Sequence, residues 1–245
     1  MSKFSLYKRV TPQEFLAEYM NRYRKKYWKA KANSVVRLFP SSFESIKVLD
    51  LGCGGGVYSL DTASKGATDI TVVDKEVFYV KAARLNLNIG QNINAGGICG
   101  DCMCLPFKEE TFDFIICVNV IERVSRGDRL LQEASRTLKR GGLLVVTARN
   151  ATSLNNLKPI RFMRLYSPKV FVKKLMRHGF NVQKHSGAYF IPYIRIANVF
   201  NSNPKVFHII KSFLEKINEF LEAKGDRPPI NKYGWEHAYL CKKKT

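Results

Sequence analysis

Three glycines at alternating positions follow an apolar run near residue 50. The stretch VLDLGCGGG places Gly52, Gly54 and Gly56 directly after residues 46–51, whose apolar and β-branched side chains are typical of a buried strand. Glycine allows the backbone to turn sharply and to approach a ligand, because it has no Cβ. The spacing is neither the GxGxxG of dinucleotide-binding folds nor the GKS or GKT of a P-loop, so the loop alone does not identify its ligand.

An acidic residue ends the next apolar run. ITVVD at 70–74 reads as a second buried strand, and Asp74 lies 18 positions after Gly56. A carboxylate at this place can accept hydrogen bonds from both hydroxyls of a ribose in a bidentate pair. The glycine loop and Asp74 together therefore indicate a ligand that carries a ribose.

Three cysteines fall within the stretch CGDCMCLPF at 99–107. Cys99, Cys102 and Cys104 could suggest half of a metal site or a redox pair. No second group of Cys or His with zinc spacing occurs elsewhere in the sequence, and disulfides are uncommon in cytosolic proteins. We therefore predict neither a metal nor a redox pair here, and we interpret Cys99 and Cys104 as small apolar fillers.

The elements that must position these residues alternate between strand-like and helix-like patterns. Such alternation predicts an α/β fold, doubly wound, with a mostly parallel sheet covered by helices on both faces. Right-handed crossovers then place the carboxyl ends of the parallel strands at one edge, where ligands bind. The expected strands are 46–51, 70–74, 95–99, 112–120, 143–148, 180–185 and 235–243, and the expected helices between them are 57–66, 76–89, 128–139, 168–178 and 204–224.

A basic amphipathic helix is expected near the N-terminus. Apolar side chains recur at intervals of three and four over residues 12–38, with basic side chains on the opposite face and a break expected near Asn33. Pro12 suits the first turn of a helix, and Thr11 could cap it.

The net charge of +21 is unevenly spread. Residues 1–40 carry 10 Lys and Arg against 2 Asp and Glu, residues 41–148 carry 12 against 13, and residues 149–245 carry 19 against 5. A basic surface attracts polyanions such as nucleic acid, anionic lipid headgroups or a phosphorylated substrate. The alternative is a solubility feature or an adaptation to the internal conditions of the host cell.

The sequence also indicates in which cellular compartment the protein is expected to act. No apolar run approaches the roughly 20 residues that cross a bilayer, and the N-terminal stretch MSKFSLYKRV lacks the apolar core of a signal peptide. We expect a cytoplasmic protein whose basic flanks could contact an anionic membrane or nucleic acid peripherally.

Five stretches, in order, resemble the motifs of the class I S-adenosylmethionine-dependent methyltransferases. They are VLDLGCGGG, VVDKE, GDCMCLPF, FDFIICVNVIERV and LLQEASRTLKRGGLLVVTARN, which together span about residues 46–150. The resemblance implies a Rossmann-like, seven-stranded sheet with a helical lid, and S-adenosylmethionine as cofactor with S-adenosylhomocysteine as product. It divides the chain into a basic helix or lid at 1–40, a cofactor-binding core at 41–186, a helical substrate-cap insertion at 187–234, and a final strand with a basic tail at 235–245.

The resemblance also implies roles for individual residues. Asp50 and the loop from Gly52 through Cys53 to Gly56 would hold the methionine end of the cofactor. Asp74, beside Lys75, would bind the ribose. The remaining roles fall to three residues: Asp101 would accept from the adenine amino group, the backbone N–H of Cys102 would bind the adenine ring, and Asn119 would face the sulfonium and the substrate. Asn119 could instead be a strand-end residue that caps backbone groups.

The region after residue 148 more loosely resembles the subgroup that O-methylates quinone precursors. Asn150, Ser167-Pro168 and Gly179-Phe180 fit that subgroup. Some members carry two acids and a histidine that ligate a divalent metal, but here Glu122 is followed by Arg123. An arginine cannot ligate a cation, so we predict no metal at this point.

Methyl transfer from a sulfonium requires alignment of nucleophile, methyl and sulfur, and a base helps when the acceptor is a hydroxyl. His237 is our candidate base, whereas His178 is interpreted as a helix-end residue that complements the helix dipole. Apolar side chains within 187–234, together with the N-terminal helix, could form a lid over a lipophilic acceptor or simply pack on the core.

The main functional hypothesis is methyl transfer to a small, lipophilic or anionic acceptor at oxygen. An RNA methyltransferase is the alternative that the charge supports. A non-catalytic S-adenosylmethionine-binding protein is the alternative of another class. The presence of Asp50, Asp74 and Asp101 counts against it, because it argues against a decayed site.

Overall fold

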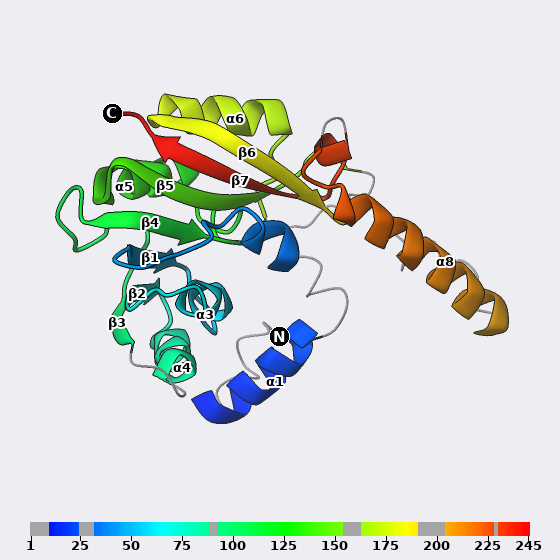
Figure 1. Ribbon diagram of the computed structural model, residues 1–245, viewed down its shortest axis with the longest axis horizontal. Helices are drawn as coiled ribbons and strands as arrows, with labels where there is room; N and C mark the ends of the chain where they lie inside the picture. Colours follow the sequence, from blue (N-terminus) through cyan, green and yellow to red (C-terminus); the bar gives the residue numbers. More distant parts are fainter. Residues whose placement is uncertain (1–9, 25–31, 89–92, 154–162, 191–203, 228–229) are drawn as a thin grey trace.

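Seven strands form one sheet in the order β3-β2-β1-β4-β5-β7-β6 (Figure 1). The computed structural model describes residues 10–24, 32–88, 93–153, 163–190, 204–227 and 230–245. From β3 to β5 all neighbouring strands are parallel, and β7 runs antiparallel to both β5 and β6. The strands are β1 Lys47–Leu51, β2 Asp69–Asp74, β3 Asn94–Cys99, β4 Phe112–Cys117, β5 Leu138–Arg149, β6 Phe180–Ala188 and β7 Glu236–Lys243.

Helices cover both faces of this sheet, as the alternating pattern predicts. They are α1 Pro12–Arg24, α3 Val57–Ala63, α4 Val77–Asn88, α5 Gly127–Thr137, α6 Pro168–Arg177 and α8 Pro204–Ala223, with a short 3-10 helix η3 at Ile230–Lys232. Alternate residues of β1 point to opposite faces: Leu49 packs with side chains of α5 and α6, and Val48 packs with those of α3 and α4. The doubly wound, mostly parallel fold is therefore confirmed.

The parallel strands bring the predicted site residues to one edge. Residues 52–56 follow β1, Asp74 ends β2, and Asn119 lies just after β4. Because β7 is reversed, its first residue, Glu236, lies opposite Arg149 at the end of β5. The start of β7 thus shares the edge at which the parallel strands end.

Helix α1 is capped as expected, but its position was not anticipated. The Thr11 hydroxyl accepts the Glu14 N–H at 3.3 Å, and Glu14 in turn accepts the Thr11 N–H at 2.7 Å. Phe15 and Leu16 are buried against α4, where the Phe15 ring lies 5.3 Å from that of Phe78. Where the sequence predicts one helix over 12–38, the structure describes two helices, α1 and a short helix at 32–36. Residues 25–31 lie outside the described part.

Strand β5 begins five residues earlier than the sequence pattern predicts. It starts at Leu138, directly after α5, and includes Gly141 and Gly142. The register between β4 and β5 shifts between Phe112 and Phe114. The pairing of the two strands is therefore irregular at the end of β5 that carries the two glycines. The pattern missed this part because glycine has a low strand propensity.

Helix α8 extends outward from the β6 end of the sheet (Figure 1). The Asn218 side chain holds it there, because its Oδ1 accepts the Phe190 N–H at 2.9 Å just beyond β6. Helix α1 packs near the opposite end of the sheet, on α4. Among the helices that the structure describes, none combines the length and the apolar character needed to cross a bilayer.

Candidate cofactor site and acceptor pocket

The loop after β1 is fastened to the end of β2 by its backbone. The N–H groups of Gly52 and Cys53 both donate to the Val73 carbonyl, at 2.7 and 3.1 Å. Gly52 has a φ of 70°, and a Cβ there would lie 2.4 Å from a methyl of Val120. Gly56 has a φ of 72° and begins α3. A Cβ on Gly56 would lie 2.9 Å from the Cβ of Ala83, so both positions require glycine for conformation and for space.

Asp74 closes this loop from the neighbouring strand. Its Oδ2 accepts the Gly54 N–H at 3.1 Å, and its Oδ1 accepts the Glu76 N–H at 3.1 Å. Partial burial raises the Asp74 pKa, and these two hydrogen bonds oppose that rise. A carboxylate oxygen accepts more than one hydrogen bond, so both oxygens can still accept from ribose hydroxyls. The arrangement fits the ribose that the sequence indicates.

Asp50 lies beneath the glycine loop and is only 2% exposed. Its Oδ2 accepts the Ser59 hydroxyl at 2.6 Å. Burial raises the Asp50 pKa to about 7, and the nearby charge of Asp74 adds to the rise. A cation next to this carboxyl would favour its ionised form, and the methionine end of S-adenosylmethionine carries an ammonium group. The residues present therefore fit this end of the cofactor.

Helix α1 covers the glycine loop from the solvent side. A Cβ on Gly55 would lie 2.6 Å from ring carbons of Tyr19, and the Tyr19 hydroxyl is 3.3 Å from the equivalent position on Gly54. Asn86 of α4 donates its side-chain N–H to the Gly55 carbonyl at 3.0 Å. The sequence singled out neither residue: it left open whether the helix that carries Tyr19 forms a lid over the substrate or packs on the core, and Asn86 only fell within a predicted helix.

The loop after β3 carries the predicted adenine contacts. Asp101 is exposed, and its Oδ1 accepts the Met103 N–H at 2.8 Å, which forms a tight turn. Cys102 is partly buried. Helix α5 fixes the following residues, because the buried Glu133 accepts the Leu105 N–H at 2.8 Å. Glu133 had no signal in the sequence beyond its place on a predicted helix.

Arginine reinforces the same attachment. Arg136 donates to the Phe107 carbonyl at 2.7 Å and to the Leu105 carbonyl at 3.1 Å, and it pairs with Glu133 at 2.9 Å. The arginine hydrogen bonds lower the Glu133 pKa, so this carboxyl stays ionised. Helix α5 thus holds the loop in one shape by charged hydrogen bonds.

The three clustered cysteines have free thiols. Cys99 and Cys104 are exposed, so our interpretation of them as apolar fillers is wrong; the Cys99 thiol instead contacts the carbonyl of the exposed Lys75 at 3.4 Å. Sequence spacing cannot tell which strand face a cysteine occupies at an edge. Over the residues that the structure places, no group of three or more His, Cys, Asp or Glu is arranged to hold a metal.

Asn119 turns the chain out of the sheet after β4. It has a φ of 60°, in the left-handed region that Asn tolerates better than most residues. Its N–H donates to the Thr147 hydroxyl at 2.8 Å, which ties the end of β4 to β5. This hydrogen bond uses the backbone of Asn119, so the role of its side chain, at the edge where an acceptor would approach, stays a prediction.

A buried ion pair lies beside Asn119. Glu122 is 1% exposed, and the Arg149 Nε lies 3.8 Å from its Oε1. The Arg149 guanidinium also lies 4.6 Å from the centre of the Trp235 ring. Glu122 thus has Arg149 as a counter-ion in this structure, while Arg123 points to solvent.

His237 is enclosed rather than presented to a ligand. It is 1% exposed, its Nδ1 lies 3.1 Å from the Tyr239 hydroxyl, and its Nε2 lies 3.0 Å from the Gly234 carbonyl. Nε2 therefore donates to the carbonyl, and Nδ1 accepts from Tyr239. Burial lowers the His237 pKa to about 3, with a further contribution from nearby His185. This environment favours a structural role over that of a base, whose pKa should lie near the working pH.

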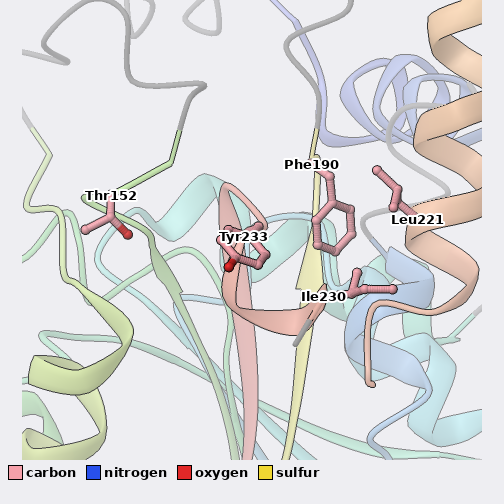
Figure 2. A pocket seen from close by; sticks show the side chains of 5 residues that line it. All are labelled: Thr152, Phe190, Leu221, Ile230 and Tyr233. Carbon is pink, nitrogen blue, oxygen red and sulfur yellow. The ribbon is translucent and has the colours of Figure 1, made fainter. Parts of the chain in front are cut away.

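A pocket of about 280 Å³ opens at the same edge, beyond β5, β6 and β7 (Figure 2). We call it the acceptor pocket. Its lining is mainly apolar and comes from four parts of the chain: Thr152, Phe190, Leu221, Ile230 and Tyr233. A mainly apolar pocket with two hydroxyl-bearing side chains, Thr152 and Tyr233, suits a small, largely apolar molecule.

Asn150 fastens two of the segments whose residues line the acceptor pocket. Its Nδ2 donates to the carbonyls of Lys232 and Gly234, at 3.2 and 2.9 Å, and its Oδ1 accepts the Thr152 N–H at 2.9 Å. One buried amide thus joins the segment after β5 to the segment before β7. The sequence picked out Asn150 by resemblance, and the structure shows what its side chain contacts.

Comparisons with known proteins agree with this geometry. Residues 49–146 match the family model described as "Methyltransferase domain". The chain is 28% identical over 199 residues to the uncharacterized protein MJ0638 of Methanocaldococcus jannaschii, covering 78% of this chain and 80% of that protein. It is 32% identical to the ubiquinone biosynthesis O-methyltransferase of Brucella ovis and 30% identical to the sterol 4-C-methyltransferase of Caenorhabditis elegans. Those matches cover 46% and 42% of this chain, but only 45% and 31% of the two enzymes.

Solved structures share the fold at low sequence identity. One is a chain from the complex between the Trm112 methyltransferase activator of Haloferax volcanii and the "putative methyltransferase". It aligns with a TM-score of 0.67 at 17% identity, over 97% of this chain and 99% of that one. The [4+2]-cyclase SpnF gives 0.62 at 19% identity, over 91% and 85%. The motifs, the strand order and the matched domain agree: over residues 49–146 the chain is similar to the methyltransferase domain family, and its fold is the one that these solved structures share.

Proposed function

We propose that the protein transfers a methyl group from S-adenosylmethionine to an oxygen of a small, largely apolar acceptor. The observation that carries the proposal is the pairing of a ribose-type acid with the glycine loop, Asp74 with Gly54 at 3.1 Å, at the sheet edge that also holds an apolar pocket. The ubiquinone-biosynthesis relative supports oxygen as the acceptor atom, since its name gives an O-methyltransferase.

The chain's own residues would bind and orient the cofactor and shield it from water. When bound, S-adenosylmethionine supplies a methyl group activated by its sulfonium. Asp50 and the glycine loop would hold the methionine end, and Asp74 would hold the ribose. Asp101 and the Cys102 N–H would hold the adenine, on a loop that α5 fixes. Tyr19, lying over Gly55, would exclude water from this side, and exclusion of water favours an in-line displacement.

The acceptor would enter by the acceptor pocket. Its oxygen would attack the methyl carbon as the carbon–sulfur bond breaks, and the hydroxyl proton would pass to solvent or to a base. The apolar lining by Phe190, Leu221 and Ile230 favours a lipophilic body for the acceptor.

Two other functions compete with this one. RNA methylation is supported by the net charge of +21, but the small apolar pocket and the sterol and ubiquinone names among the relatives favour a small molecule. A binding protein without transfer activity would use the same cofactor site. SpnF is a [4+2]-cyclase that shares this fold, so the fold alone does not decide between these functions.

An assay of labelled methyl transfer distinguishes the three functions: methylation of a small molecule, methylation of RNA, and cofactor binding without transfer. The full-length protein is incubated with methyl-labelled S-adenosylmethionine and, in parallel, with total RNA or with an extract of lipids and quinone precursors. We expect label in the organic phase, and loss of it in Asp74→Ala. Label in RNA would support the second function, and binding without any transfer would support the third. A matched control is Asp69→Ala, because Asp69 lies on the same strand and pairs with the surface residue Lys47.

A further inference from the structure

Helix α8 presents a stripe of large apolar side chains to solvent. Ile209, Phe213 and Phe220 are 70%, 62% and 57% exposed, and their spacing places them on one side of the helix. The 20 residues of α8 extend outward from the sheet, so the stripe is accessible along its length (Figure 1). A contiguous exposed apolar surface of this kind marks a site of interaction.

Charged side chains are sorted around this stripe. Lys205 lies four positions before Ile209, and Lys216 lies three positions after Phe213 and four before Phe220, so both exposed lysines lie on the same face of the helix as the stripe. The carboxylates of Glu215 and Glu219 lie toward the other side of the helix. An apolar face bordered by lysines, with the acids turned away, is the pattern of a helix that lies in the interface of an anionic bilayer.

The inner end of α8 continues this pattern toward the acceptor pocket. The Lys224 ammonium lies 4.2 Å from the centre of the Phe220 ring, and Tyr233 is 67% exposed nearby in sequence and on the pocket rim. Aromatic and basic side chains of this kind gather at the level of lipid headgroups. Leu221, one residue beyond Phe220, lines the pocket itself.

We propose that α8 docks the protein on the surface of an anionic phospholipid membrane, with the stripe of Ile209, Phe213 and Phe220 inserted among the lipid chains. The 19 Lys and Arg against 5 Asp and Glu of residues 149–245 supply a long-range attraction to such a surface. A lipophilic acceptor could then pass from the bilayer along α8 into the acceptor pocket, and this second part rests on the proposed function.

Vesicle co-sedimentation tests the docking without any assay of methyl transfer. The full-length protein is mixed with vesicles of phosphatidylcholine alone or of phosphatidylcholine with phosphatidylglycerol, at low and high salt. We expect binding to the anionic vesicles that weakens with salt. Phe213→Ser with Phe220→Ser should reduce the partition coefficient by about tenfold or more. The matched control is Val170→Ser with Met176→Ser, two residues of α6 that are 58% and 51% exposed, and it should bind like the unmodified protein.

Two results would overturn the docking. One is equal vesicle binding by the α8 variant and the unmodified protein, with both folded as judged by circular dichroism. The other is a dimer in light scattering that the α8 variant loses, together with no vesicle binding, since the stripe would then serve a second copy of the chain. Vesicle binding without methyl transfer would leave the docking intact and count only against the proposed function.

Discussion

The Gly54 N–H donates to the Asp74 carboxylate at 3.1 Å, across the gap between the ends of β1 and β2. The two residues are 20 positions apart in sequence, and the parallel pairing of Leu51 with Val73 brings them together. This hydrogen bond links the loop directly to the acid, and it acts together with the bonds of Gly52 and Cys53 to Val73 and of Glu76 to Asp74. The same carboxylate that would bind the cofactor therefore also shapes the loop around it.

Cofactor affinity should depend on pH through Asp50. Its pKa is raised to about 7 by burial, so below pH 7 the carboxyl of the ligand-free protein is largely protonated. Binding of an ammonium group requires the ionised form, so affinity should rise with pH between about 5.5 and 7, by up to about tenfold per pH unit. The ammonium itself stays protonated over that range. Calorimetry in matched buffers measures the slope, and Asp50→Asn should flatten it. A slope unchanged in Asp50→Asn would assign the dependence to another group.

Tyr19 should slow the release of the cofactor. Truncation by Tyr19→Ala removes the ring that lies over Gly55, so we expect affinity to fall about threefold to tenfold, or ~0.7–1.4 kcal/mol. Stopped-flow dissociation and equilibrium titration measure the effect. Gln13→Ala is the control, because Gln13 is exposed on the same helix. Equal loss in both variants would mean that α1 acts only through helix stability.

Glu133 should couple α5 to the adenine loop. Glu133→Ala removes the acceptor of the Leu105 N–H and the partner of Arg136, so the free energy of unfolding should fall by ~1–3 kcal/mol. Cofactor affinity should fall with it, because the loop after Asp101 loses its attachment. Urea unfolding and titration of the folded protein separate the two effects. The exposed Glu109→Ala is the control, and an affinity unchanged in folded Glu133→Ala would remove the coupling.

His237 should not govern the pH dependence of the rate. With a pKa near 3 its ring stays neutral at any working pH, and both ring nitrogens already have partners. His237→Phe should lower the melting temperature, because the Tyr239 hydroxyl and the Gly234 carbonyl lose a partner. The rate of the folded fraction should keep its pH profile. A profile that loses its acidic limb in this variant would restore His237 as the catalytic base.

Most of the fold followed from local patterns. The strands and helices of residues 46–188 were predicted within a few residues, because buried parallel strands read as apolar runs and glycines mark their ends. The start of β5 was missed where Gly141 and Gly142 carry no side-chain signal. The predicted site acids, Asp50, Asp74 and Asp101, could be named because each belongs to a motif that is local to one strand end.

The residues that support the glycine loop and Asp50 were not predictable in this way. Tyr19, Ser59 and Asn86 reach the glycine loop and Asp50 from three different helices, and no spacing in the sequence links them. The acceptor pocket likewise combines Thr152, Phe190 and Tyr233 from distant segments. Such contacts depend on tertiary packing, and a pattern along the chain carries no information about them.

Titration calorimetry with S-adenosylmethionine on the unmodified protein, Asp74→Ala and Asp69→Ala tests the central claim most directly. We expect binding by the unmodified protein and by Asp69→Ala, and a loss of at least about tenfold, ~1.4 kcal/mol, in Asp74→Ala. Circular dichroism establishes that the Asp74→Ala protein is folded. Equal affinity in folded Asp74→Ala, or no binding by the unmodified protein, would contradict the placement of the cofactor at this edge.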